Sequence, residues 1–288
     1  MTKPDQRDTW RVLDAPMFGA IGRGNRMPTV QVDDVSLKYD ETGEGHPLVL
    51  IMGLGCTSDL WLCQVNEFAK RFRVITFDNR GVGASSEGTK DYSIEVFADD
   101  AAALLRKLGV DRAHVLGVSM GGTIGQQLVL RHPDLVDRLV LACTWCRTSA
   151  FGLSLLQAWS DVATGAGMDV LTRLTFAQYL TPSLYGQNPE MVQHLYEIAM
   201  SGTSVETYVK QNKACARHDA YEGLESWFGD TLVLVGEHDG QTTMGAAREI
   251  AARVPKAELV VLKDVGHGMM WEDPDKFNQA VIDFLERA

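Results

Sequence analysis

A serine flanked by glycines, Ser119, is the first residue of this sequence at which chemistry is expected. The segment Gly117-Val118-Ser119-Met120-Gly121 joins an apolar run at 113–118 to a helix-period segment at 123–130. A strand that turns into a helix this abruptly forces strained dihedral angles on the residue at the bend, and neighbouring glycines remove side chains that would collide. The helix N-terminus that follows favours developing negative charge. The segment predicts a nucleophilic serine, with a plain helix N-cap as the alternative.

A serine hydroxyl is a poor nucleophile at neutral pH, so it needs a base, and the base needs an acid to orient it. On a strand-turn-helix scaffold the three groups follow in the order serine, acid, histidine, each just past a strand end. Asp239 follows the apolar run at 231–235, and His267 follows the run at 258–262. We therefore predict Ser119, Asp239 and His267 as the catalytic residues.

Two neighbours are alternatives for these roles. Glu237 precedes Asp239 by two residues and offers another carboxylate, while His238 offers another imidazole. His238 comes before the last strand and adjoins the acid, so the chain order favours His267 as the base.

The oxyanion that forms on an attacked carbonyl group needs preorganised N–H donors. The Met120 N–H, directly after the serine, is one candidate, and the loop after the strand at 47–52 should supply the second. That loop reads Met52-Gly53-Leu54-Gly55-Cys56, and its glycines let the backbone approach a substrate. We expect the Leu54 N–H to be the second donor, with a glycine turn of no such role as the alternative.

A further glycine-rich loop occupies residues 78–85 and contains Arg80. Its place after the strand at 72–77 suggests that it shapes the loops around the site. We expect Arg80 to be structural, with its guanidinium group tied to neighbouring carbonyls or carboxylates.

Apolar, β-branched runs alternate with helix-period segments along most of the chain. This alternation implies parallel strands joined by helical crossovers, and near-continuous apolar strands imply a sheet covered on both faces. We therefore predict an α/β fold with a doubly wound, mostly parallel sheet. Helix caps are expected at Ser93 and Asp273. The predicted strands are residues 29–32, 47–52, 72–77, 113–118, 138–142, 231–235 and 258–262.

The alternation breaks between residues 146 and 229, where apolar helical patterns occur without a convincing strand. We predict that this segment is an inserted helical cap and that residues 27–145 and 230–288 form the α/β core. Residues 1–26 are interpreted as an N-terminal extension that lacks the apolar segment of a secretory signal. The expected location is the cytoplasm.

The formal net charge of −11 and the absence of a basic block argue against nucleic acid or membrane surfaces as partners. The five cysteines are odd in number and scattered, which indicates a reducing compartment. Cys143 and Cys146 have CxxC spacing, but with no second pair they are expected to be buried thiols. No metal and no cofactor are expected.

Together these motifs resemble the α/β-hydrolase superfamily over nearly the whole chain. The resemblance rests on the serine segment, on D-x-R-G-x-G-x-S at 78–85, on Gly-x-x-Asp at 236–239 and on Gly-His at 266–267. Within the superfamily the chain looks most similar to the branch of 3-oxoadipate enol-lactonases and small esterases. The resemblance implies that the helical insertion is the family's cap domain.

One departure from the family pattern is Met52-Gly53, where many relatives carry His-Gly. Donation by the Leu54 backbone does not require that histidine. Haloalkane dehalogenases and epoxide hydrolases are similar in fold only, because they use an aspartate nucleophile where this chain has Ser119.

The predicted function is that of a serine hydrolase, which cleaves a carboxylic ester or lactone through an acyl-enzyme intermediate. The same three residues could instead cleave a carbon–carbon bond in a vinylogous diketone, or pass the acyl group to an acceptor such as peroxide. A non-enzymatic alternative is a small-molecule receptor with residual hydrolysis.

The substrate is expected to be a small ester or lactone held in an apolar pocket. Lys210, Lys213 and Arg217 fall at helix spacing and are interpreted as a solvated helix face, with recognition of a substrate carboxylate as the alternative. The oligomeric state is open, a homodimer being one option. The candidate substrate-binding residues are Gly53, Cys56, Trp145, Trp159 and Met269.

Overall fold

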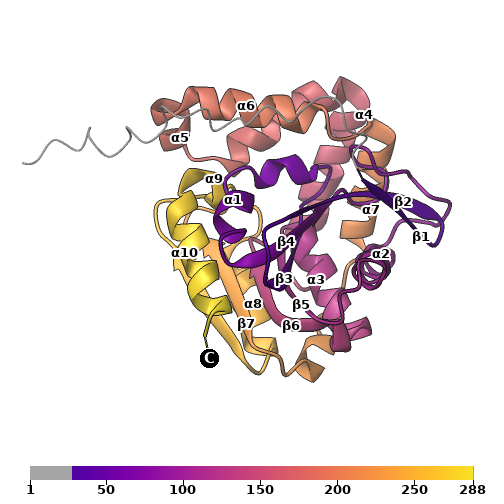
Figure 1. The fold of residues 1–288 in the computed structure, drawn as a ribbon. Coiled ribbons are helices and arrows are strands. Elements are labelled where there is room, and N and C mark those ends of the chain that lie inside the picture. The colour runs from indigo at the N-terminus through magenta and orange to yellow at the C-terminus, as the bar shows by residue number, and fades with distance from the viewer. Residues whose placement is uncertain (1–27, 288) are drawn as a thin grey trace, which may run out of the picture.

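The computed structural model describes residues 28–287, which are built around one eight-stranded sheet (Figure 1). Its strands are β1 (Thr29–Val32), β2 (Val35–Thr42), β3 (His46–Ile51), β4 (Phe72–Phe77), β5 (Ala113–Val118), β6 (Val136–Ala142), β7 (Thr231–Gly236) and β8 (Ala257–Leu262). They lie in the order β1-β2-β4-β3-β5-β6-β7-β8. The pairs β1–β2 and β2–β4 are antiparallel and the other five are parallel. The predicted α/β fold with a mostly parallel sheet is confirmed.

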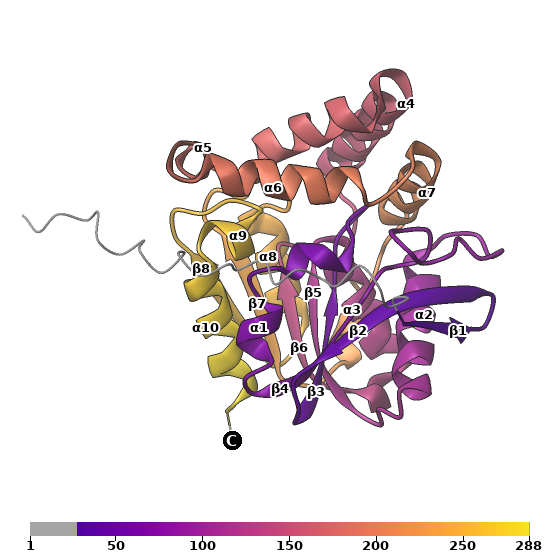
Figure 2. The ribbon, with the colours of Figure 1, turned by 45° about the horizontal axis from the view of Figure 1, so that its top comes forward.

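Helices cover both faces of the sheet (Figure 2), which explains why its central strands are apolar on both sides. All residues of β5 and β7 are buried. One face packs against α2 (Ile94–Lys107), α3 (Met120–Arg131) and α8 (Met244–Arg253), and the other against α1 (Val65–Phe68), α9 (Met269–Glu272) and α10 (Pro274–Leu285). Ser93 and Asp273 cap α2 and α10 as predicted. Short 3-10 turns lie at Ser58–Trp61, Pro133–Leu135 and Gly223–Ser226.

The strand β2 is the one that the sequence analysis does not predict. It forms a hairpin with β1, in which Val32 pairs with Val35 and residues 33–34 make the turn. Val35 and Leu37 are buried, whereas Ser36 between them is polar and half-buried. Such alternation is typical of a strand with one solvated face. It escapes a search for continuous apolar runs, which is why β2 was missed.

Four helices lie between β6 and β7, where an insertion was expected. They are α4 (Ala150–Tyr179), α5 (Pro182–Gln187), α6 (Pro189–Met200) and α7 (Val205–Ala216), and they lie over the carboxyl ends of the strands (Figure 2). Gly167, with φ 86°, interrupts α4 near its middle. Within the described residues no helix is both long enough and apolar enough to pass through a bilayer. The predicted extension at residues 1–26 lies outside the described part of the chain.

Arg80 connects the β1–β2 turn to α2 and is fully buried. Its guanidinium group binds both carboxylate oxygens of Asp100 (2.7 and 2.8 Å) and Asp34 (3.1 Å). This confirms the structural role expected for Arg80. Burial works against the charge of Asp34, but hydrogen bonds from Arg80 and from the N–H groups of Thr89 and Lys90 hold its pKa well below the ordinary value.

Candidate active site

Ser119 lies between the end of β5 and the start of α3, in the sharp bend expected from the sequence. Its dihedral angles, φ 56° and ψ −120°, are strained for a residue with a side chain. The Ser119 N–H donates to the Ala142 carbonyl (2.9 Å), and the Ser119 carbonyl accepts the Thr144 hydroxyl (2.7 Å). The Ser119 side chain caps no N–H group of α3. The structure therefore contradicts the N-cap alternative.

Gly117 and Gly121 permit this bend because no side chain fits at either position. A Cβ atom at 117 would lie 2.2 Å from the carbonyl oxygen of Gly121, and one at 121 would lie 2.0 Å from the carbonyl oxygen of Ile51. Both distances are far inside van der Waals contact. The two glycines are therefore required by the crossing of strand and helix.

Asp239 and His267, predicted as acid and base, are in direct contact. The His267 Nδ1 atom lies 2.9 Å from Asp239 Oδ2, and both side chains are buried. Asp239 also accepts the N–H groups of Gln241 (2.9 Å) and Thr242 (3.0 Å) and the Thr242 hydroxyl (2.6 Å). Burial disfavours the charge of Asp239, yet the charge of His267 and these hydrogen bonds keep its pKa below the ordinary value. An ionised carboxylate here can fix the tautomer of the imidazole.

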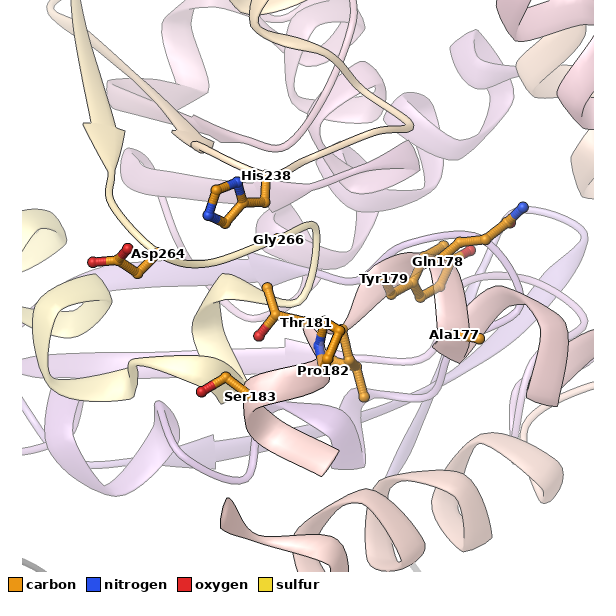
Figure 3. A pocket seen from close by; sticks show the side chains of 10 residues that line it. Ala177, Gln178, Tyr179, Thr181, Pro182, Ser183, His238, Asp264 and Gly266 are labelled. Atoms are coloured by element: carbon orange, nitrogen blue, oxygen red, sulfur yellow. The ribbon is translucent and has the colours of Figure 1, made fainter. Parts of the chain in front are cut away.

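The alternative acid and base are not part of this arrangement. Glu237 and His238 are both exposed, and the Glu237 carboxylate accepts the N–H group of Asp264 (3.2 Å). His238 and Asp264 line a cavity of about 630 Å³ whose other walls come from residues 177–183 and Gly266 (Figure 3). Asp239 therefore contacts His267, whereas Glu237 and His238 do not take part in this pair.

Two residues that the sequence analysis did not connect with His267 hold its loop. The ring of Tyr179, at the end of α4, packs on the His267 ring with 4.9 Å between centroids, and its carbonyl accepts the Gly268 N–H (3.0 Å). The Cys143 thiol donates to the His267 carbonyl (3.2 Å). Cys143 and Cys146 are buried, as predicted, and all five cysteines are free. Burial raises the pKa of the Cys143 thiol, so it remains protonated and able to donate.

The loop expected to supply an oxyanion donor lies against Ser119. A Cβ atom on Gly53 would be 3.3 Å from Ser119 Cβ. The N–H group of Gly55 donates to Gln211 Oε1 on α7 (2.8 Å), and Gln211 Nε2 donates to the Arg80 carbonyl (3.3 Å). The N–H groups of Leu54 and Met120 donate to no other group in the described part of the chain. Both backbone donors are thus available to a ligand.

A cavity of about 480 Å³ opens onto Ser119 and Leu54. Of the other predicted substrate-binding residues, Trp145 and Trp159 line it, whereas Gly53, Cys56 and Met269 do not. The Cys56 thiol turns back to the Leu54 carbonyl (3.4 Å), Gly53 is buried beneath Ser119, and Met269 is fully buried in the core. The apolar part of the lining consists of Leu54, Trp145, Phe151, Leu155, Leu156, Trp159, Tyr179 and Ala246.

The three basic residues singled out for a substrate carboxylate lie elsewhere. Lys210 pairs with Glu87 and Glu206, and Arg217 donates to the Tyr92 carbonyl. None of the three residues lines the cavity at Ser119, which agrees with their interpretation as a solvated helix face. The cations that do line this cavity are Arg147 and Arg248.

Comparison with known proteins identifies the family. Residues 46–274, which include Ser119, Asp239 and His267, match the family described as alpha/beta hydrolase fold. The chain belongs to this family. As an α/β hydrolase with enol-lactonase and esterase relatives, it is a hydrolase that acts on ester bonds.

Three relatives show how far the similarity of this α/β hydrolase extends. It is 29% identical to 3-oxoadipate enol-lactonase 2 of Acinetobacter baylyi (strain ATCC 33305 / BD413 / ADP1), over 90% of this chain and 96% of that one. It is 30% identical to the protein of Caulobacter sp. (strain K31) that carries the name "Putative carbamate hydrolase RutD", over 83% of this chain and 90% of that one. The crystal structure of the enol-lactonase from Burkholderia xenovorans LB400 superposes with a TM-score of 0.85 and 29% identity, over 90% of this chain and 100% of that one.

Proposed function

We propose that this α/β hydrolase cleaves a carboxylic ester or lactone through an acyl-enzyme intermediate on Ser119. The observation that carries the proposal is the buried Asp239–His267 contact beside the cavity onto which the strained Ser119 opens. Tyr179 connects the two features, because its ring packs on His267 and also lines that cavity. The chain thus has a nucleophile, a base and an orienting acid at one end of the sheet.

In the proposed reaction, His267 takes the proton of the Ser119 hydroxyl as its oxygen attacks the substrate carbonyl carbon. The N–H groups of Leu54 and Met120 donate to the oxyanion that forms. The carbonyl re-forms as the alkoxide leaves with the proton from His267. Water then gives a proton to the same imidazole as it attacks the acyl-enzyme, and that proton passes to the Ser119 oxygen as the acid leaves. Asp239 keeps the imidazole in the tautomer whose Nε2 accepts the proton.

The shape and lining of the cavity support a small hydrophobic substrate. About 480 Å³ is within the usual range for small-molecule sites, and aromatic and aliphatic side chains from α4 form much of its wall. In this proposal residues 146–229 act as the cap that determines acyl preference. The enol-lactonase relatives favour a lactone or ester, and the relative named for carbamate hydrolysis makes a carbamate the second candidate.

The decisive experiment compares wild-type and Ser119→Ala enzymes on p-nitrophenyl esters of increasing acyl length, on aliphatic and aromatic lactones, and on p-nitrophenyl carbamates. We expect turnover by the wild type on esters or lactones, and loss of all but about a thousandth of it in the variant. A folded Ser119→Ala enzyme that keeps a few per cent of activity would refute the acyl-enzyme mechanism.

Product analysis separates the rival reactions, since transfer to an alcohol or to peroxide and cleavage of a vinylogous diketone leave different products. Turnover of the carbamates alone would move the proposal to the second candidate. A protein that binds the panel tightly but turns it over far more slowly than about once per second would favour the receptor interpretation.

A further inference from the structure

Two histidines and an aspartate come together at the end of the sheet opposite the candidate active site. His46 is the first residue of β3, His114 is the second of β5 and Asp137 is the second of β6. These strands are adjacent and parallel. Their amino ends therefore meet at the edge of the sheet that faces away from α4–α7 (Figure 2), whereas Ser119 follows the carboxyl end of β5.

The three side chains are spaced as ligands of one metal ion would be. Asp137 Oδ2 lies 3.4 Å from His46 Nε2 and 3.5 Å from His114 Nδ1, and the three potential ligand atoms lie within 4.8 Å of one another. A tetrahedral ion with bonds of about 2.0–2.1 Å separates its ligand atoms by about 3.3–3.4 Å. Two of the three ligand–ligand distances are therefore close to those of a bound site.

His114 provides independent support for a missing ligand. Its side chain is only 6% exposed, and among the described residues its Nδ1 atom has no hydrogen-bond partner. A buried polar atom without a partner costs stability, so such atoms are rare. A bound metal ion would supply the partner that this buried nitrogen lacks.

An ion could reach this cluster from solvent, because the side chains of His46 and Asp137 are 41% and 34% exposed. Two arginines face the cluster. Arg112 lies 3.7 Å from the other oxygen of Asp137, Oδ1, and leaves Oδ2 to the histidines. Arg138 donates to the carbonyls at the end of α10, which engage its guanidinium group.

We propose that His46, His114 and Asp137 form a binding site for one transition-metal ion, with Zn²⁺ as the best match. Two imidazoles and one carboxylate suit Zn²⁺ better than Mg²⁺ or Ca²⁺, which prefer oxygen ligands throughout. Water would fill the fourth position. Because the site joins the amino ends of three strands and lies at the opposite edge from Ser119, its effect is on stability and not on the hydrolytic step.

The test uses the full-length protein, freed of metal with a chelator and titrated with ZnCl₂ by calorimetry. We expect binding of one Zn²⁺ per chain and a higher Tm in its presence. His46→Gln and Asp137→Asn should each weaken binding at least tenfold and reduce the Tm increase at the same ZnCl₂ concentration. These two residues are chosen over the buried His114 because their side chains are partly exposed, so the variants should fold.

Two control variants exclude the other clusters that could capture the ion. Cys143, Asp239 and His267 form one such group, and Glu237, His238 and Asp264 form another. His267→Asn and His238→Gln should retain the wild-type stoichiometry and affinity. The proposal is overturned if His46→Gln binds like the wild type, if either control loses the ion, or if the wild type binds none. Esterase activity of His46→Gln should equal that of the wild type.

Discussion

The contact between α7 and the proposed oxyanion loop yields the sharpest prediction about this site. Gln211 is fully buried, accepts the Gly55 N–H at 2.8 Å and donates to the Arg80 carbonyl at 3.3 Å. The Leu54–Gly55 peptide is thereby held in one orientation, with the Leu54 N–H left free. Gln211→Leu keeps a side chain of similar size and removes both hydrogen bonds.

Two effects of different size are expected. Each buried backbone group left without a partner costs about 1–3 kcal/mol, so the loss of two partners should lower the free energy of unfolding by about 2–6 kcal/mol. Loss of an oxyanion donor costs about 10²–10³ in kcat. Gln211 acts only through the loop, and the hydrogen bond from Cys56 N–H to the Gly53 carbonyl (3.2 Å) remains. We therefore expect a decrease in kcat of about 10–100-fold, with KM changed less than about threefold.

Asn278→Leu is the matched control, because Asn278 on α10 is buried and donates to the Cys63 carbonyl (2.9 Å). It should lose comparable stability in urea denaturation while keeping the wild-type kcat on the preferred p-nitrophenyl ester. Both variants are assayed at a temperature where circular dichroism shows them to be folded. If Gln211→Leu kept kcat within twofold of the wild type, the loop would not depend on α7 and the reasoning would fail.

Three further predictions concern the acid, the pH dependence and the cavity. Asp239→Asn should lower kcat by about 10³–10⁴, whereas Glu237→Gln stays within twofold; equal losses in steady-state assays would contradict the assignment of the acid. Asp34, with its lowered folded pKa, contributes stability that is complete above about pH 4 and is lost as the pH falls below it. Between pH 6 and pH 3 the Tm of Asp34→Asn should therefore be lower than that of the wild type at pH 6 and should fall less as the pH decreases. Parallel curves of Tm against pH for the two proteins would refute this. Trp159→Leu should shift the acyl-length optimum toward longer chains, and an unchanged profile across the ester series would place acyl binding elsewhere.

The placement of Ser119, Asp239 and His267 at one end of the sheet could be predicted because each lies just past a strand end. In a parallel sheet the carboxyl ends of the strands meet at one edge, so strand assignments alone bring these residues to the same region. The close approach of strand and helix at Ser119 can also be recognised in the sequence, because only glycine fits at positions 117 and 121. The alternation of strands and helices could also be predicted, because strands that are covered on both faces are apolar throughout.

Other features depend on contacts that no local pattern records. Gln211 meets Gly55 across 156 residues of sequence, and nothing in an amphipathic helix distinguishes this glutamine from a solvated one. Tyr179 reaches His267 in the same way, from the end of α4. The cavity lining was predicted only in part, because a residue close in sequence to the proposed oxyanion donor Leu54, such as Cys56, can turn its side chain away from the cavity.

The crowding at Gly117 and Gly121 bears on how new genomes are searched for enzymes of this kind. Since a methyl group at either position would collide with the backbone, both glycines would survive in a descendant that had abandoned catalysis but kept its architecture. The spacing of these two glycines is therefore a marker of the fold and not of catalysis. The residue at the position of Ser119 carries the information about reactivity. A sequence with this glycine spacing but no serine, cysteine or aspartate at that position should therefore be classed with binding proteins until turnover is measured.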